Sequence, residues 1–181
     1  MSGDEYLKSL DMRVVVGRFD AFHLPRIVQL IQHAHRFNLT AHRYTEAECE
    51  ALMSDPGVLP LYVKLSDRLE DHGLIGIVVL SPKGEELLIL DWVMNEGVLD
   101  RGVEQYLMNV VVGQAQSRGC TRVSGEYIRA AENGMVSDFF AQFGFTMIGD
   151  DPDHTLWVLP VSAYEPVETW IQAGESAALT K

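Results

Sequence analysis

The sequence has few cysteines and no long hydrophobic run. Only two of its 181 residues are cysteine, Cys49 and Cys120, and they lack the short spacing of a metal-binding pair. No apolar stretch approaches the length that crosses a bilayer, so we expect no membrane partner. Residues 1–6 are polar and acidic, unlike an export signal. We therefore expect reduced cysteines and a cytoplasmic location.

Positive charge is also scarce. Fourteen lysine and arginine residues face 26 aspartate and glutamate residues, which gives a formal net charge of −12 at pH 7. A nucleic-acid backbone would be repelled by this surplus, so nucleic acid is excluded as the main partner. The histidines His23, His33 and His35 fall in or near one predicted helix, but no two have the four-residue spacing of a helical metal pair. We predict no metal site.

The remaining composition is that of one globular domain. Hydrophobic residues make up 47% and charged residues 22%, which is ordinary for such a domain. The length suffices for one full core but not for two comfortable ones. We expect a lead-in over residues 1–10, a domain over residues 11–160, and a tail or linker over residues 161–181.

The first half of that domain predicts helices followed by strands. A helical apolar pattern runs from Ala21 to Phe37, and the capping-box spacing from Thr45 to Glu48 opens a second helix. Strands are predicted over residues 12–16, 59–65, 74–80 and 86–94, with turns at Asp71-His72-Gly73 and Ser81-Pro82-Lys83-Gly84.

The second half alternates strand and helix. An apolar strand over residues 87–94 precedes a helix from Val103 to Arg118, which opens at Arg101-Gly102. A strand over residues 121–127, a short helix from Asn133 to Gly144 and a final hairpin follow. A helix that opens at glycine beyond a strand presents free backbone N–H groups, which suits a phosphate.

This order of elements, and the motifs near the end of the domain, resemble the GNAT acyltransferases. Asn133-Gly134-Met135-Val136 and Phe139-Phe140-Ala141-Gln142-Phe143-Gly144-Phe145 are similar to that family's last motif. The resemblance implies an α+β fold, with a mixed, mostly antiparallel sheet of about six to seven strands flanked by about four helices.

A narrower resemblance is to the C-terminal GNAT-like domain of FkbH-type proteins, without their phosphatase half. It is carried by Phe37-Asn38-Leu39-Thr40 with Arg43-Tyr44, by Trp92-Val93-Met94 with Arg101-Gly102-Val103-Glu104, and by Gly125-Glu126-Tyr127-Ile128. FkbH-type proteins make or transfer glyceryl units on acyl carrier proteins. The resemblance therefore implies an acyltransferase acting on acyl thioesters of a carrier protein, in polyketide or mixed peptide–polyketide biosynthesis.

The same resemblance assigns the site. The donor is phosphopantetheine on an acyl carrier protein, or a coenzyme A thioester, and the partner is that carrier or a neighbouring polyketide synthase domain. An acidic carrier needs a local basic patch, for which Arg101, Arg118, Arg122 and Arg129 are candidates, although scattered solvated arginines explain them equally well. The cofactor-binding candidates are Arg101, Gly102, Val103 and Asn133. The substrate-binding candidates are Asn38, Thr40, His42, Arg43, Trp92 and Asn95, although Asn38 and Thr40 are also typical of turns.

Three positions depart from the families' patterns. Glu96 stands where FkbH-like domains have cysteine, so a covalent thioester relay is replaced by a direct route with Glu96 as the base. Phe140 stands where many GNAT enzymes have a proton-donating tyrosine, and Tyr127 is the nearest replacement. Glu104 stands where glycine or alanine would let a pyrophosphate approach, which favours a carrier-bound phosphodiester over free coenzyme A.

Two alternatives remain open. The fold can serve as a decarboxylase or hydrolase with Glu96 handling a proton, or as a non-catalytic domain that recognises the carrier protein. The loss of the family cysteine and tyrosine favours the recognition domain.

Overall fold

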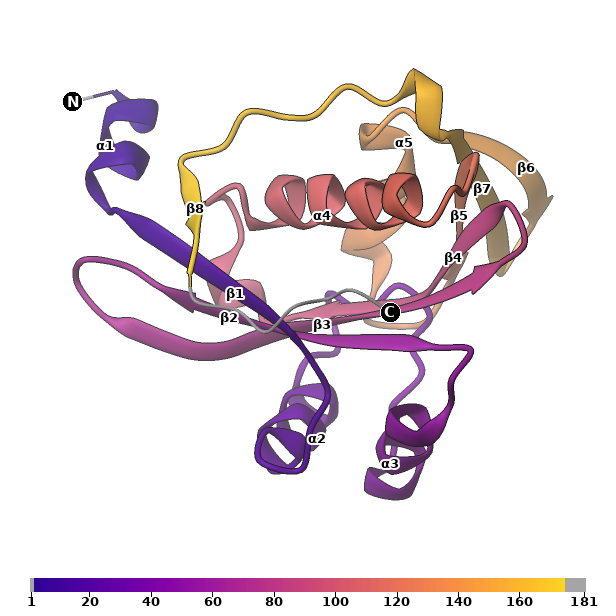
Figure 1. Cartoon of the computed structure of the whole chain (residues 1–181), viewed down its shortest axis with the longest axis horizontal. Helices are drawn as coiled ribbons and strands as arrows, with labels where there is room; N and C mark the ends of the chain where they lie inside the picture. The colour runs from indigo at the N-terminus through magenta and orange to yellow at the C-terminus, as the bar shows by residue number, and fades with distance from the viewer. Residues whose placement is uncertain (1, 175–181) are drawn as a thin grey trace.

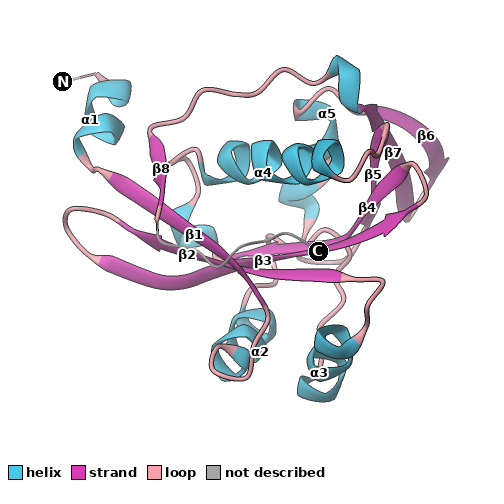
Figure 2. Ribbon diagram, viewed as in Figure 1, coloured by secondary structure: helices cyan, strands magenta, loops and turns pink. Residues whose placement is uncertain are grey.

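The computed structural model describes residues 2–174 and contains a mixed sheet between two layers of helices (Figures 1 and 2). Its helices are α1 (Gly3–Ser9), α2 (Leu24–His33), α3 (Glu46–Ser54), α4 (Val103–Ser117) and α5 (Phe139–Gln142), with 3-10 turns η1 (Glu96–Val98), η2 (Gly134–Val136) and η3 (Val161–Ala163). Its strands are β1 (Met12–Arg18), β2 (Leu59–Ser66), β3 (Asp71–Lys83), β4 (Glu86–Met94), β5 (Arg122–Ile128), β6 (Thr146–Asp151), β7 (His154–Pro160) and β8 (Ile171–Ala173).

The strands lie in the order β6-β7-β5-β4-β3-β2-β1-β8. The β4–β5 and β1–β8 pairs are parallel and all the others are antiparallel. The predicted α+β class and the mostly antiparallel mixed sheet are confirmed. Over the described residues the sheet has eight strands instead of six to seven. The prediction missed β8, for which the sequence gives no signal.

Each face of the sheet has its own apolar core. Helices α4 and α5 cover one face and α2 and α3 cover the other (Figure 1). The α4-side core includes Trp92, Val103, Phe139 and Phe140. The α2-side core includes Ile27, Leu30, Ile31, Cys49 and Val93. Each face of the sheet is therefore shielded from water, which explains the apolar runs in its central strands.

The helix predicted from Ala21 to Phe37 is shorter in the structure. Pro25 stands in the first turn of α2, as expected, but the helix ends at His33. The residues after it leave the helix and enter the sheet. The capping box at the start of α3 is confirmed, because the Thr45 side chain accepts from the Glu48 amide and the Glu48 side chain accepts from the Thr45 amide.

Strands β4 and β5 pair over only part of their length. Their register runs from Glu86 opposite Arg122 to Ile89 opposite Gly125, and the described parts of the two strands do not pair beyond that point. β4 has a bulge at the same place. The residues on either side of Leu90 pair with successive positions of β3, and Leu90 itself has no partner there. The bulge reverses which face each later residue of β4 points to.

The gap between β4 and β5 holds a segment of the same chain, residues 37–39. The Leu39 amide donates to the Trp92 carbonyl (3.2 Å), and the Phe37 carbonyl accepts from the Met94 amide (3.0 Å). On the other side, the Leu39 carbonyl accepts from the Ile128 amide (2.9 Å). The segment therefore bridges the two strands in the plane of the sheet.

Both flanking segments are more ordered than the sequence suggests. Residues 3–9 of the expected lead-in form α1. Residues 161–173 of the expected tail form η3, a segment that runs along α4, and β8. Asn109 of α4 fixes this segment, because its side chain bonds the amide and the carbonyl of Val167 (2.9 and 2.8 Å). The rest of the expected tail, residues 175–181, lies outside the described residues.

Candidate functional site

The start of α4 has the backbone form predicted for it. Gly102 is the N-cap residue and has φ 89°, in the left-handed region where glycine is favoured. Asp100 before it also has a positive φ of 66°. Val103 is fully buried and anchors the first turn in the α4-side core. The first N–H groups of α4 have no carbonyl partner within the helix.

Arg101, predicted to hold a phosphate, is engaged elsewhere. Its guanidinium Nη1 lies 3.2 Å from Oδ2 of Asp67, just beyond the end of β2. The same oxygen lies 2.8 Å from Nε2 of His72. Burial raises the pKa of Asp67, but the bonds from His72 and from the Glu70 and Leu69 amides outweigh it and hold the pKa at about 2. Arg101 therefore pairs with a fully ionised carboxylate.

Carboxylates surround the same helix start. Glu104 and Asp100 line a cavity of about 180 Å³ together with Phe139 and Phe143 of the α5 region. Oε1 of Glu104 is buried without a hydrogen-bond partner in the described part of the chain. Burial raises the pKa of Glu104, and the charge of Asp100 raises it further. This environment disfavours additional negative charge, as a diphosphate would bring.

Asn133 and Tyr127 form one buried network. The Asn133 side-chain amide donates to the carbonyls of Asn38 and Ile128 (both 2.9 Å), and its oxygen accepts from the Ala130 amide (2.8 Å). The Tyr127 hydroxyl donates to the same side-chain oxygen (3.3 Å). Asn133 thereby ties the segment in the gap to the end of β5. The binding role predicted for Asn133 and the catalytic role predicted for Tyr127 stay predictions.

Phe140 is core. It is 1% exposed, and its ring lies against Gly125 so closely that a Cβ there would overlap it. Burial raises the pKa of Tyr127, the residue predicted to replace a tyrosine at this position.

The loop after the gap segment is a compact turn. The Asn38 side-chain oxygen accepts from the amides of Thr40 (3.1 Å) and Ala41 (3.0 Å), and its amide group donates to the His42 carbonyl (2.9 Å). The Thr40 hydroxyl accepts from the His42 amide (3.3 Å). The turn-forming interpretation of Asn38 and Thr40 is confirmed, and their predicted contacts with substrate remain untested.

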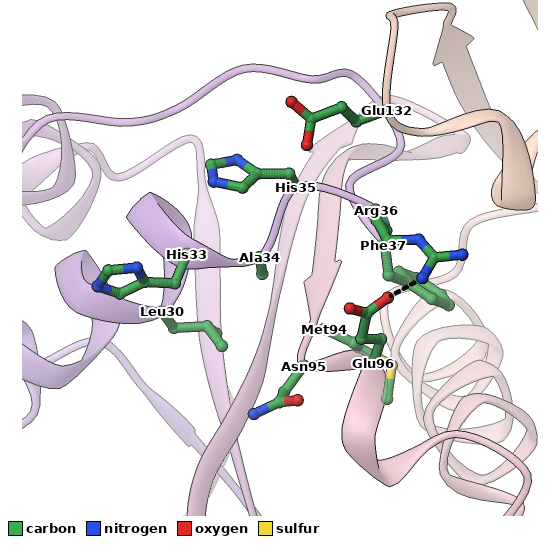
Figure 3. Close-up of a pocket in the computed structure, with 10 residues that line it drawn as sticks. All are labelled: Leu30, His33, Ala34, His35, Arg36, Phe37, Met94, Asn95, Glu96 and Glu132. Carbon is green, nitrogen blue, oxygen red and sulfur yellow. Dashed lines mark ion pairs between the residues drawn. The ribbon is translucent and has the colours of Figure 1, made fainter.

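Two neighbouring cavities lie beside this loop. The first, of about 270 Å³, lies between the end of α2 and the end of β4, and Figure 3 shows its lining residues. The second, of about 320 Å³, is lined by Asn38, Ala41, Arg43, Ala130 and Ala131. His35 and Glu132 line both cavities.

Glu96 and Asn95 line the first cavity. Glu96 is half-exposed, and its Oε2 lies 3.2 Å from Nη1 of Arg36, as the dashed line in Figure 3 marks. The Asn95 side chain accepts from the Gly97 amide (2.8 Å) and begins η1. The cavity therefore brings together both charge signs. The predicted base, Glu96, is accessible there, whereas His42 lies on the surface and pairs with Glu48 (3.1 Å).

Asp91, in the middle of β4, has no role predicted from the sequence. It is fully buried, and its Oδ1 accepts from the Trp92 amide (2.8 Å). Its Oδ2 has no hydrogen-bond partner among residues 2–174. Burial raises the pKa of Asp91 to about 7, although the Trp92 amide, Thr40 and the charge of His42 act to lower it. The signal in the sequence is a lone carboxylate within an otherwise apolar strand.

Trp92, predicted to contact substrate, is also fully buried. Its ring packs edge-on against Phe139 with 4.8 Å between the ring centroids. Its Nε1 is buried and bonds no other described residue. The side chain is thus part of the α4-side core beside the gap.

In the described part of the chain, no cluster of three histidine, cysteine, aspartate or glutamate side chains is arranged to hold a metal ion. Nor does any described helix have the length and apolar character needed to span a membrane.

Comparison with solved structures identifies the fold. The chain superimposes on an acetyltransferase from Thermus thermophilus with a TM-score of 0.63 and 17% identity, over 83% of this chain and 99% of the other. It matches the ribosomal-protein-S18-alanine N-acetyltransferase of Escherichia coli with a TM-score of 0.63 and 14% identity, over 82% and 94% of the two chains. The spermidine N-acetyltransferase of Vibrio cholerae, solved with CoA and spermine, gives a TM-score of 0.64 and 15% identity, over 84% and 98%.

These likenesses show that the chain has the GNAT fold, as its motifs predict. No family model and no curated protein matches the sequence. The narrower FkbH-like resemblance therefore stays a prediction.

Proposed function

We propose that this protein transfers an acyl group from a thioester donor to a small acceptor. The observation that carries the proposal is the gap between β4 and β5, because Phe37 of the segment in the gap lines the same cavity as Asp100 and Glu104 at the start of α4. Once residues 37–39 leave the gap, its two strands would present backbone groups to an extended donor arm, and the helix start would present N–H groups to a phosphate beyond it. The Vibrio cholerae neighbour, which has the same fold, was solved with CoA.

We favour a donor carried on the phosphopantetheine of an acyl carrier protein, in polyketide or mixed peptide–polyketide biosynthesis. Asp100 and Glu104 stand at the helix start, and Arg101 is already paired with Asp67. Among the described residues that line this cavity, a diphosphate would meet two carboxylates and no guanidinium. A single phosphodiester carries half that charge, so its binding costs less.

The acceptor is expected in the two cavities on the other side of the gap. Arg36 and Glu96 line the first cavity and Arg43 lines the second. Groups of both signs suit an acceptor that carries both an acidic and a basic group. In this scheme Glu96 and Asn95 contact the acceptor.

One observation favours a second candidate, a non-catalytic domain that recognises the carrier protein. The gap is filled by residues 37–39, whose bonds reach both strands. If this segment never leaves, a thioester cannot enter the sheet, and the surface alone can bind a partner.

The test is intact-protein mass spectrometry of carrier proteins loaded with glyceryl, acetyl, malonyl or methylmalonyl groups. Each is incubated with the protein and an amino-acid acceptor, with the matching acyl-CoA in parallel. We expect loss of the acyl mass from a carrier and its gain by the acceptor. Loss without gain would indicate a hydrolase, and loss of carbon dioxide a decarboxylase. An unchanged carrier that still binds would refute the transferase and support the recognition domain.

A further inference from the structure

We propose that Asp91 is a catalytic base of this protein, and that it is uncovered when residues 37–44 move to admit a donor. The proposal rests on the acyl transfer proposed above and adds a residue that neither the motifs nor the comparisons assign.

The position of Asp91 is set by the bulge in β4. Leu87 and Ile89, before the bulge, and Trp92 and Met94, after it, all lie in the α4-side core. Because Leu90 is the extra residue, the side chain of Asp91 lies on the opposite face, with Val93 and the α2-side core. Asp91 thus stands at the point where β4 and β5 separate, on the face away from α4.

Burial of the Asp91 carboxyl group destabilises the folded state, and packing does not compensate for this. The group is 0% exposed, and one of its oxygens bonds nothing within the described chain. A buried acceptor without a partner is destabilising, so its presence calls for an explanation, and a catalytic role is one. A carboxyl with a pKa of about 7 is poised to take and return a proton near neutral pH.

The residues that act on the pKa of Asp91 come from its own strand and from the loop: Trp92, Thr40 and His42. The charge of His42 lowers the pKa of Asp91. Burial raises the pKa of Tyr44, and the charge of Asp91 raises it further. Glu48 and Cys49 of α3 act on Tyr44 in the same direction. The Tyr44 hydroxyl therefore stays protonated at neutral pH and cannot replace Asp91 as a base.

The cover over Asp91 is continuous with the segment in the gap. Thr40, which lies close enough to Asp91 to lower its pKa, follows directly after Leu39. If a donor arm takes over the bonds that Leu39 makes to Trp92 and Ile128, Thr40 must move with Leu39. One displacement therefore opens the gap and exposes the carboxylate to the acceptor side.

The step balances without any further reagent. The Asp91 carboxylate takes the proton from the acceptor's O–H or N–H as its electron pair forms a bond to the thioester carbonyl carbon. When the carbon–sulfur bond breaks, sulfur leaves with the electron pair, and Asp91 returns the proton to it. The products are the acylated acceptor and the free thiol.

The first test concerns the cover. The protein is treated with a carbodiimide and glycinamide, which label accessible carboxyl groups, with and without S-acetyl-phosphopantetheine as the probe. Hydrogen exchange of the Leu39 amide is followed under the same two conditions. We expect labelling of Asp91 only with the probe present, and at least tenfold faster exchange of the Leu39 amide. An unlabelled Asp91 or an unchanged Leu39 amide overturns the proposal.

The second test concerns the chemistry, through the pH profile of kcat/KM. Asp91→Asn is expected to lower kcat at least 100-fold and to abolish the acidic limb of the profile near pH 7, with carrier binding kept. Asp11→Asn, at an exposed aspartate, is the matched control. If Asp91→Asn keeps its rate or its acidic limb, Asp91 is not the base although the transferase stands. If the wild type turns over no donor, the proposed function itself fails.

Discussion

The substitution Asp91→Asn should make the stability of the protein less dependent on pH. The folded-state pKa of Asp91 is about 7, against 3.8 for the free group. Between these values the native state holds a proton that the unfolded chain releases, so stability falls as pH rises. About three pKa units at ~1.4 kcal/mol each give a loss of about 4 kcal/mol between pH 4 and pH 8.

The sign follows from the direction of the shift. A raised carboxyl pKa contributes nothing below pH 4, where both states are protonated, and its full destabilisation above pH 7, where the native group ionises too. Asparagine keeps the acceptor for the Trp92 amide but cannot titrate. Its own unpaired amide hydrogens add a penalty that is the same at every pH, so the difference between two pH values isolates the carboxyl.

Urea unfolding followed by tryptophan fluorescence measures this, because Trp92 is fully buried in the native state. Wild type and Asp91→Asn are compared at pH 4, 6 and 8, with Asp11→Asn as the control for an exposed carboxyl. We expect the advantage of Asp91→Asn over wild type to grow by about 4 kcal/mol from pH 4 to pH 8. Parallel curves for the two proteins would show that the Asp91 carboxyl is not destabilised by burial, and the argument would fail.

Three further substitutions test the packing around the site. Gly125→Ala should cost about 1–3 kcal/mol, because its Cβ overlaps the Phe140 ring; urea unfolding measures this. Asn133→Ala leaves two carbonyls and an amide without their partner and should cost at least about 2 kcal/mol; native-state hydrogen exchange should rise at the end of β5. Asp67→Asn removes a carboxyl whose pKa is lowered, so the decrease in stability as pH falls from 4 to 2 should shrink; acid unfolding measures it.

Each of these has a clear contrary result. An unchanged urea midpoint for Gly125→Ala would mean that the Phe140 ring moves without cost. Unaltered exchange in Asn133→Ala would show that the gap segment is held by its backbone bonds alone. An acid transition in Asp67→Asn that is identical to wild type would show that the bonds from His72 and from the Glu70 and Leu69 amides do not lower the pKa of Asp67.

Local patterns in the sequence predict much of this fold. The glycine opening of α4, the capping box of α3 and the final hairpin each depend on residues a few positions apart, and all three are confirmed. The GNAT fold follows from the order of these elements and from the closing motif, and the solved structures confirm it.

The site was less predictable because its decisive contacts are long-range. Nothing near Arg101 in the sequence indicates that Asp67 pairs with it. Leu39 bridges β4 and β5 through backbone hydrogen bonds. Because any residue can make such bonds, no sequence pattern predicts this contact. Asp91 carries a local signal, a carboxylate inside an apolar run, but its significance depends on burial that only the folded chain shows.

The pairing of β8 with β1 also has a consequence for how the chain reaches its native state. Met12 lies opposite Ile171, so the outermost parallel pair joins residues from nearly opposite ends of the described chain. Contacts of such high sequence separation form late and slowly, because closing a long loop costs entropy before any bond rewards it. Until then the edge of β1 is unpaired and open to a strand from another molecule. The short strand β8 thus covers the outer edge of β1, and we expect the chain to be most exposed to aggregation before β8 docks.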